Sequence, residues 1–157
     1  MFGWYHCWRL KRRQHALAMV WCGDPATADW LVRESRASAA CLNRLDVYRR
    51  MARCWLRHLD ECGSPARHRR TPASPSSDPA ADSVRMLIAA MPMQQRMTLS
   101  LIDIARLSYR DTAGVMNIGM FDVQYQIVTA RRQLLDQLHA IHGKNVCEAH
   151  GGTLNTC

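Results

Sequence analysis

The segment from Leu107 to Leu138 reads LSYRDTAGVMNIGMFDVQYQIVTARRQLLDQL, and it holds two helix patterns separated by a short turn. Ser108 followed three residues later by Asp111 fits a capping box, which predicts a short helix that ends near Met116. The next three residues, Asn-Ile-Gly at 117–119, favour a tight turn. The segment therefore predicts a short helix followed by a sharp change of direction.

A longer helix is expected after this turn, with Asp122 as its N-cap. Its apolar residues recur at helical spacing and predict one buried face: Val123, Ile127, Ala130, Leu134, Leu138 and Ile141. A short helix, a turn of about three residues and a longer helix make a helix-turn-helix. By spacing alone, a plain helical hairpin fits equally well.

Further helix patterns lie on the N-terminal side of this segment. Pro92 is expected to open a helix that runs through Met97, Leu101 and Ile104. In the first half of the chain, Asp24-Pro25 supplies an N-cap and a proline at the first helical position. The apolar face predicted for that helix comprises Ala28, Leu31, Val32, Ser35, Ala39 and Leu42.

A helix with two different faces is expected after Asp46, which we take as its cap. The apolar face comprises Tyr48, Ala52, Trp55, Leu56 and Leu59. On another face Arg49, Arg53 and Arg57 recur every four residues, with Arg50 beside them. A row of arginines fits either a solvated surface or a contact with nucleic acid. Tyr48 and Trp55 fit either the core or a base-stacking role.

Residues 62–81 separate the two helical halves and contain four of the six prolines. A segment rich in Pro, Ser and Arg buries too little apolar surface to offset its ordering entropy, so we expect a flexible linker. The predicted fold is all-α, with two small helical domains at 1–61 and 82–142. Residues 143–157 are expected to form a flexible C-terminal tail.

Composition indicates a basic protein with a polyanionic partner. Lys and Arg total 21 against 13 acidic residues, a formal charge of +8. Nucleic acid or an anionic membrane surface fits that charge, and so does a basic protein with no such partner. The longest apolar stretch, 16–22, is too short for a membrane span, and seven scattered cysteines suit a reducing compartment. We therefore expect a cytoplasmic location and no membrane association.

Read together, these segments resemble the extracytoplasmic-function group of bacterial RNA polymerase sigma factors. In the second half, AAMPMQQR at 89–96 is similar to the family's ALPxxQR, LSYRDTA at 107–113 to LSYxEIA, and ARRQL at 130–134 to RARxxL. In the first half, CGDPATADWLVRES at 22–35 is similar to GDPxxADDLVQET, and MARCWLR at 51–57 to IARNxxxD. The matches follow the family's order, with a linker between the halves.

The resemblance implies a region 2-like domain, a region 4-like helix-turn-helix domain and a function in transcription initiation without enzymatic chemistry. It implies core RNA polymerase, promoter DNA and an anti-sigma factor as partners, and no cofactor. The residues expected to bind polymerase are Asp29, Leu31, Val32 and Glu34. The residues expected to bind DNA are Arg49, Arg50, Arg53, Arg57, Ser108, Tyr109, Gln124, Gln126, Arg131 and Arg132.

The longer helix of the predicted helix-turn-helix departs from the family pattern GTVKSRLHRAR. Gln124, Gln126 and Thr129 stand where basic residues are expected, which weakens phosphate contacts, although Gln can still pair with adenine. Two alternatives to a working sigma factor therefore stay open. One is a sigma-like protein that lacks promoter recognition and acts by binding an anti-sigma factor or polymerase. The other is an unrelated helical DNA-binding regulator.

A small group of possible metal ligands lies near the C-terminus: His139, His142, Cys147 and His150. Imidazole and thiolate are the ligands that zinc or copper prefers. The same histidines also suit the C-terminal end of a helix, where positive charge is favourable. The sequence favours no metal at this position.

Overall fold

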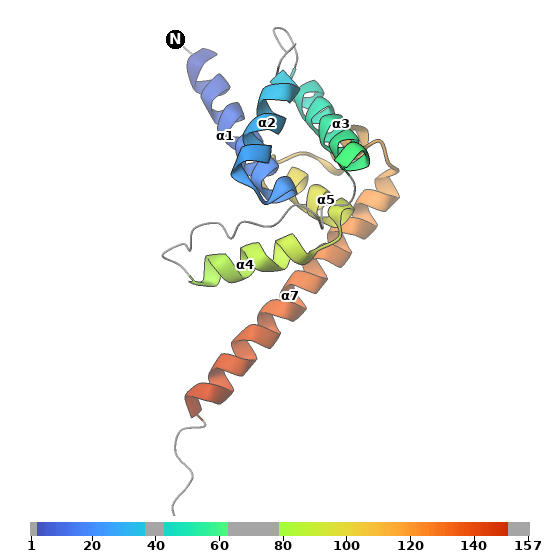
Figure 1. Cartoon of the computed structure of the whole chain (residues 1–157). Coiled ribbons are helices and arrows are strands. Elements are labelled where there is room, and N and C mark those ends of the chain that lie inside the picture. Colours follow the sequence, from blue (N-terminus) through green and yellow to red (C-terminus); the bar gives the residue numbers. More distant parts are fainter. Residues whose placement is uncertain (1–2, 37–42, 63–78, 151–157) are drawn as a thin grey trace, which may run out of the picture.

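The computed structural model describes residues 3–36, 43–62 and 79–150. Over these ranges the chain forms α-helices and no strand, which confirms the predicted all-α class. Figure 1 shows the helices: α1 (Gly3–Cys22), α2 (Pro25–Arg36), α3 (Arg44–Cys62), α4 (Pro79–Ala90), α5 (Met93–Asp103), α6 (Tyr109–Met116) and α7 (Met120–His150). Residues 63–78 of the expected linker lie outside the described residues, and α4 already begins at Pro79.

The turn between α1 and α2 forms as the sequence predicts. Gly23 adopts a left-handed backbone conformation with φ of +72°, which glycine tolerates without steric cost. Asp24 then caps α2, because its carboxylate accepts hydrogen bonds from the backbone N–H of Thr27 at 2.8 Å and from its hydroxyl at 2.7 Å. The expected apolar face of α2 is buried at Ala28, Leu31, Val32 and Ser35, whereas Ala39 and Leu42 lie outside the described residues.

The start of α3 differs from the prediction. Asn43 caps this helix, since its side-chain oxygen accepts from the backbone N–H of Leu45 at 2.9 Å and of Asp46 at 3.0 Å. The prediction of Asp46 as the cap is wrong: Asp46 lies in the first turn, where its carboxylate is 3.1 Å from Arg49. Leu56, expected in the core, is 41% exposed.

The helix-turn-helix segment forms in α6 and α7, which pack against each other and against α5. Ser108 caps α6 by accepting from the backbone N–H of Asp111 at 3.0 Å, and Asn117 ends it in the left-handed region at φ of 55°. Asp122 is not the N-cap of α7. It lies inside the first turn and accepts from the backbone N–H of Gly119 at 3.2 Å.

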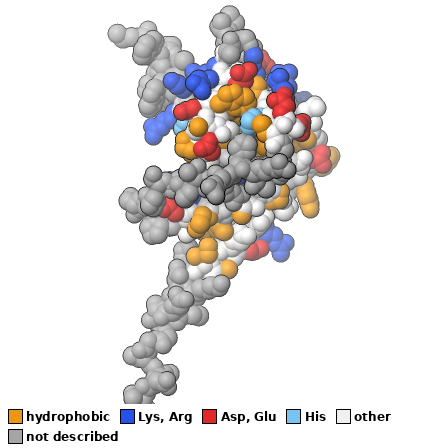
Figure 2. Space-filling view, in the orientation of Figure 1, with side chains coloured by type: hydrophobic (Ala, Val, Ile, Leu, Met, Phe, Trp, Pro, Cys, Tyr) orange, Lys and Arg blue, Asp and Glu red, His pale blue; other side chains and the backbone are white. Residues whose placement is uncertain are grey.

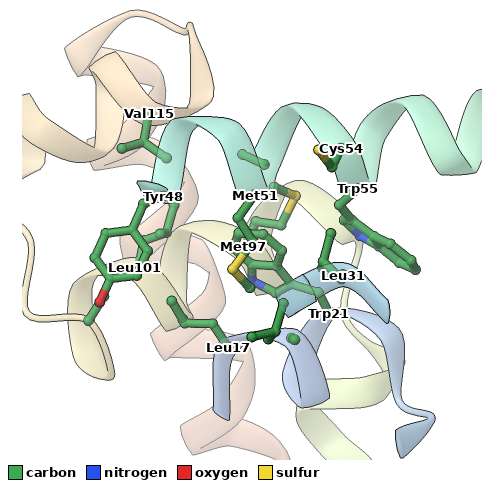
Figure 3. Packing of buried hydrophobic residues seen from close by; sticks show 14 of the residues in the cluster. Leu17, Trp21, Leu31, Tyr48, Met51, Cys54, Trp55, Met97, Leu101 and Val115 are labelled. Atoms are coloured by element: carbon green, nitrogen blue, oxygen red, sulfur yellow. The ribbon is translucent and has the colours of Figure 1, made fainter. Parts of the chain in front are cut away.

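One hydrophobic core joins helices from both sides of residues 63–78 (Figure 3). Trp21 is fully buried, and its indole N–H donates to the hydroxyl of Ser100 at 2.8 Å. Trp55 of α3 is 1% exposed and donates to the sulfur of Met93 at 3.3 Å. A smaller cluster of Met91, Leu99, Ile127 and Ala130 packs α7 against α5. The halves predicted as separate domains therefore share buried contacts in this structure.

Candidate nucleic-acid interface

The arginine row of α3 divides into two parts. Arg49 is half-buried, pairs with Asp46 at 3.1 Å, and donates from its Nε to the backbone oxygen of Gly114 in α6 at 3.3 Å. A side chain added at Gly114 would approach the Arg49 guanidinium at 3.2 Å. Arg49 therefore contributes to the contact between α3 and the helix-turn-helix segment.

Arg53 and Arg57 lie further along the same face and are exposed, and Arg50 is half-buried beside them. Among the described residues neither Arg53 nor Arg57 forms an ion pair. In Figure 2 the Lys and Arg side chains gather over the upper part of the molecule, where α1, α2 and α3 lie. This part of α3 presents positive charge that neighbouring acids leave available for phosphate groups.

The aromatic residues of α3 do not reach this exposed face. Tyr48 is fully buried, and burial raises the pKa of its hydroxyl despite the nearby Arg44 and Arg13. Trp55 is buried in the core, and His58 stacks on it with ring centres 5.6 Å apart. Of the two interpretations left open by the sequence, the structure places both Tyr48 and Trp55 in the core.

The candidate residues of the helix-turn-helix segment occupy several environments. The Ser108 hydroxyl is engaged with Asp111, whereas Tyr109 is 37% exposed. Gln124 and Gln126 are half-buried, and the Gln126 amide donates to the side-chain oxygen of Gln94 at 3.3 Å. The half-buried position of both Gln side chains limits how far they can extend to a base edge.

The two arginines of α7 also differ from each other. Arg131 lies 2.7 Å from Asp103, and that hydrogen bond raises the pKa of the guanidinium. Arg132 has 83% of its side chain exposed and lies 3.9 Å from Asp136, a separation that gives a weak surface pair. Arg132 is thus the more available of the two for an external partner.

Large apolar side chains are exposed on the outer face of α7. Phe121 is 82% exposed, Tyr125 69%, Val128 65% and Leu135 55%, and these residues form what we call the apolar seam. This surface was not predicted from the sequence, although the spacing of its residues is visible there. Val123 and Ile127 belong to the buried face of α7. The exposed apolar residues of the seam follow a second helical repeat on another face of the same helix.

The residues expected to bind polymerase lie on two faces of α2. Asp29 and Glu34 are exposed, and the Asp29 carboxylate is 3.2 Å from the His15 imidazole. Leu31 and Val32 are buried at 0% and 6% exposure. In this structure Leu31 and Val32 fix α2 to the core, and the two acidic side chains face outward.

The C-terminal His and Cys group is only partly described. His139 is exposed, whereas the side chains of His142, Cys147 and His150 lie outside those that the structure describes. Elsewhere, the side chains that the structure describes include no group of three potential metal ligands. Burial and the charge of Asp24 raise the pKa of the Cys22 thiol to about 12, so this thiol stays protonated at neutral pH.

No family model and no curated protein matches the sequence. A solved structure does match: the sigma factor RpoE from Bartonella quintana, in complex with the anti-sigma factor NepR. The match covers 82% of this chain and 91% of that chain, with a TM-score of 0.68 and 16% sequence identity.

The chain has the sigma-factor fold. The family resemblance expected from the sequence is confirmed at the level of fold, and the low identity agrees with a divergent sequence. Among the described helices of this sigma-factor fold, none combines the length and the apolar character that a membrane span requires.

Proposed function

We propose that this chain is a sigma factor that binds core RNA polymerase and directs promoter recognition and transcription initiation. The observation that carries the proposal is the sigma-factor fold with exposed Arg53 and Arg57 on α3. A protein of this kind acts by binding and positioning DNA, so exposed charge on a rigid helix is the feature its function needs.

The outer face of α2 is proposed to dock on core polymerase. Asp29 and Glu34 present carboxylates there, while Leu31 and Val32 anchor the helix from beneath. Exposed charges at the edge of an interface, such as these carboxylates, chiefly govern the rate and specificity with which two proteins associate. Exchange of Leu31 or Val32 would therefore weaken docking indirectly, through the packing of α2.

The exposed part of α3 is proposed to bind the promoter backbone. Arg53 and Arg57, with Arg50 beside them, are placed to neutralise phosphates and to release counterions. Because Trp55 and Tyr48 are buried, binding here depends on charge rather than on base stacking. The salt dependence of DNA binding should therefore report directly on α3.

The helix-turn-helix segment is proposed to make a smaller contribution to DNA binding. Tyr109 and Arg132 are exposed, whereas Arg131 is engaged with Asp103. Gln124 and Gln126 lack charge, so they add nothing to the electrostatic part of the affinity. We expect this segment to orient the protein on DNA more than to hold it there.

A second candidate function is that of a sigma-like protein that regulates through protein contacts without reading promoters. The apolar seam favours it, because large apolar residues are exposed on the helix where basic ones are expected. The similar solved structure is itself a complex of a sigma factor with an anti-sigma factor. In this candidate the partner is an anti-sigma factor or polymerase.

The test is co-purification of the full chain with core RNA polymerase, followed by run-off transcription from a promoter library. Binding with specific initiation supports the sigma factor, and Arg53→Ala should then reduce open-complex formation. Binding to core or to an anti-sigma factor without initiation supports the second candidate. Binding to neither would contradict both.

A further inference from the structure

We propose that the apolar seam of α7 is a self-association surface through which two copies of this chain pair as antiparallel helices. The seam comprises Phe121, Tyr125, Val128 and Leu135, each more than half exposed at 82%, 69%, 65% and 55%. Contiguous exposed apolar surface of this kind marks an interaction site in a folded protein.

The spacing of the seam indicates that its partner is a helix. The residues at 121, 125, 128, 132 and 135 follow alternating intervals of four and three, which is the pattern of a coiled-coil seam. The opposite face of α7 is occupied, because Val123, Ile127 and Ala130 are buried. The seam is therefore a second face of α7, distinct from the one that holds the helix to its own chain.

Arg132 is the member of this repeat that is not apolar, and its position indicates that the second helix runs antiparallel to α7. In an antiparallel pair, Phe121 of one copy would face Arg132 of the other, and Tyr125 would face Val128. An arginine over an aromatic ring gains a cation–π interaction, and the two-fold symmetry supplies it twice. Phe121, Tyr125, Val128 and Arg132 thus provide both halves of a complementary surface, and Leu135 lies beyond this paired segment.

The charges beside the seam are compatible with this pairing. In the same register Gln124 lies next to Arg131 of the second copy, and Asp122 lies next to its Thr129, so like charges do not meet. Arg132 is held within its own chain by a weak pair with Asp136 at 3.9 Å, and it can therefore turn toward a partner ring.

Long-range repulsion between two basic chains opposes the pairing but does not prevent it. Each chain carries a formal charge of +8, yet around the seam Arg131 and Arg132 are balanced by Asp122 and Asp136. Charges further away than about 8 Å are largely screened at physiological ionic strength. Dimerisation should accordingly strengthen as salt is raised, the opposite of the dependence expected for DNA binding.

Within the described residues, the seam is exposed from Phe121 to Leu135. Figure 1 shows α7 running past α4 and away from α1, α2 and α3. Among the described helices, the main contacts of α7 are with α4, α5 and α6. A second helix can therefore approach the outer face without displacing the core.

Sedimentation of the full chain in the absence of DNA and polymerase tests the proposal. Over about 1 µM to about 1 mM, wild-type protein should show a reversible monomer–dimer equilibrium. Val128→Glu should weaken it by about tenfold or more, since each dimer buries two added charges. Met86→Glu is the matched control, because Met86 is 67% exposed on α4 and should leave the equilibrium unchanged.

A charge exchange tests the antiparallel register. Phe121→Lys and Arg132→Glu should each dimerise poorly alone, and a mixture of the two should form a mixed dimer through the new Lys–Glu pair. Circular dichroism of each variant shows whether its helices are retained.

Two results would overturn the proposal: wild-type protein that stays monomeric throughout this range, or a dimer that Val128→Glu leaves intact. Binding of the seam only to a helix of another protein counts as the first of these results. Because neither polymerase nor promoter takes part, these measurements do not depend on whether the proposed sigma function is correct.

Discussion

The outer faces of α3 and α7 have opposite chemistry, although the family resemblance assigns both helices to DNA. The face of α3 presents the exposed cations Arg53 and Arg57, whereas α7 presents Phe121 and Tyr125 with 82% and 69% of their surface exposed. Both helices nevertheless keep a buried face that packs into the core.

This difference shows which positions determine the fold and which determine the partner. A fold is retained when the buried residues keep their size and spacing, while exposed residues change at little cost in stability. Similarity at 16% identity therefore supports the fold of α7, and its ligand has to be inferred from the exposed residues.

The largest effect is expected from opening the main core, which buries α3 and includes residues of α5, the helix against which α7 packs. Trp21→Ala should lower the free energy of unfolding by about 3–5 kcal/mol, because it opens a cavity and leaves the Ser100 hydroxyl without its indole donor. Urea unfolding followed by circular dichroism measures the loss, and Trp21→Phe should cost less. Two separate unfolding transitions in wild-type protein would contradict a shared core.

A second effect is expected when α7 is given positive charge like that of α3. Gln124→Lys combined with Thr129→Arg should raise affinity for duplex DNA by about tenfold at low salt, because two phosphate contacts are added. Fluorescence anisotropy over a salt series should show a steeper slope, by about two in log affinity against log salt. An unchanged slope would mean that α7 does not approach the DNA backbone.

The helix ends show how much of the local structure could be predicted from the sequence. Ser108 and Asp24 were predicted as caps because each precedes a clear helical repeat, and both accept backbone hydrogen bonds. Asn43 was missed in favour of Asp46, since both residue types cap helices and only the geometry selects between them. Local patterns fix a cap to within about one helical turn.

The contacts between the halves were beyond the sequence. Trp21 and Ser100 lie 79 residues apart, and no local pattern indicates that their side chains meet. The division of the arginine row has the same origin in part, because Arg49 contacts Gly114, 65 residues away, whereas Arg53 is exposed. The family resemblance supplied the arrangement of helices, whereas burial of Tyr48 and exposure of Phe121 required the structure.

A smaller effect is expected from pH. Burial raises the pKa of Cys22 to about 12, and the unfolded thiol ionises near ~8.5. Ionisation therefore favours the unfolded state above pH ~8.5, and the free energy of unfolding should fall by about 2 kcal/mol by pH ~10. Denaturation of Cys22→Ala across this range should lack that part of the decline. Equal declines in both proteins would contradict the assignment of this effect to Cys22. Burial also raises the pKa of Tyr48, and Tyr48→Phe removes the contribution of that side chain to the decline.

The smallest effect on stability is expected from loss of the N-caps of α3 and α6, two helices that contact each other. Ser108→Ala at α6 and Asn43→Ala at α3 should each cost about 1 kcal/mol of stability, because each removes a side-chain acceptor for backbone N–H groups. Asp46→Ala should cost less than Asn43→Ala, since Asp46 supplies a partly exposed ion pair and no cap. A larger loss of stability from Asp46→Ala than from Asn43→Ala in chemical denaturation would mean that Asp46 caps α3.

The most direct test of the central claim is the salt dependence of DNA binding, measured with matched double variants of the two helices. Arg53→Gln with Arg57→Gln should reduce the slope of log affinity against log salt by about two. Arg131→Gln with Arg132→Gln removes the same charge from α7 and should reduce the slope by less than half as much, since Arg131 is already paired with Asp103. A larger loss from the α7 pair than from the α3 pair would contradict the account.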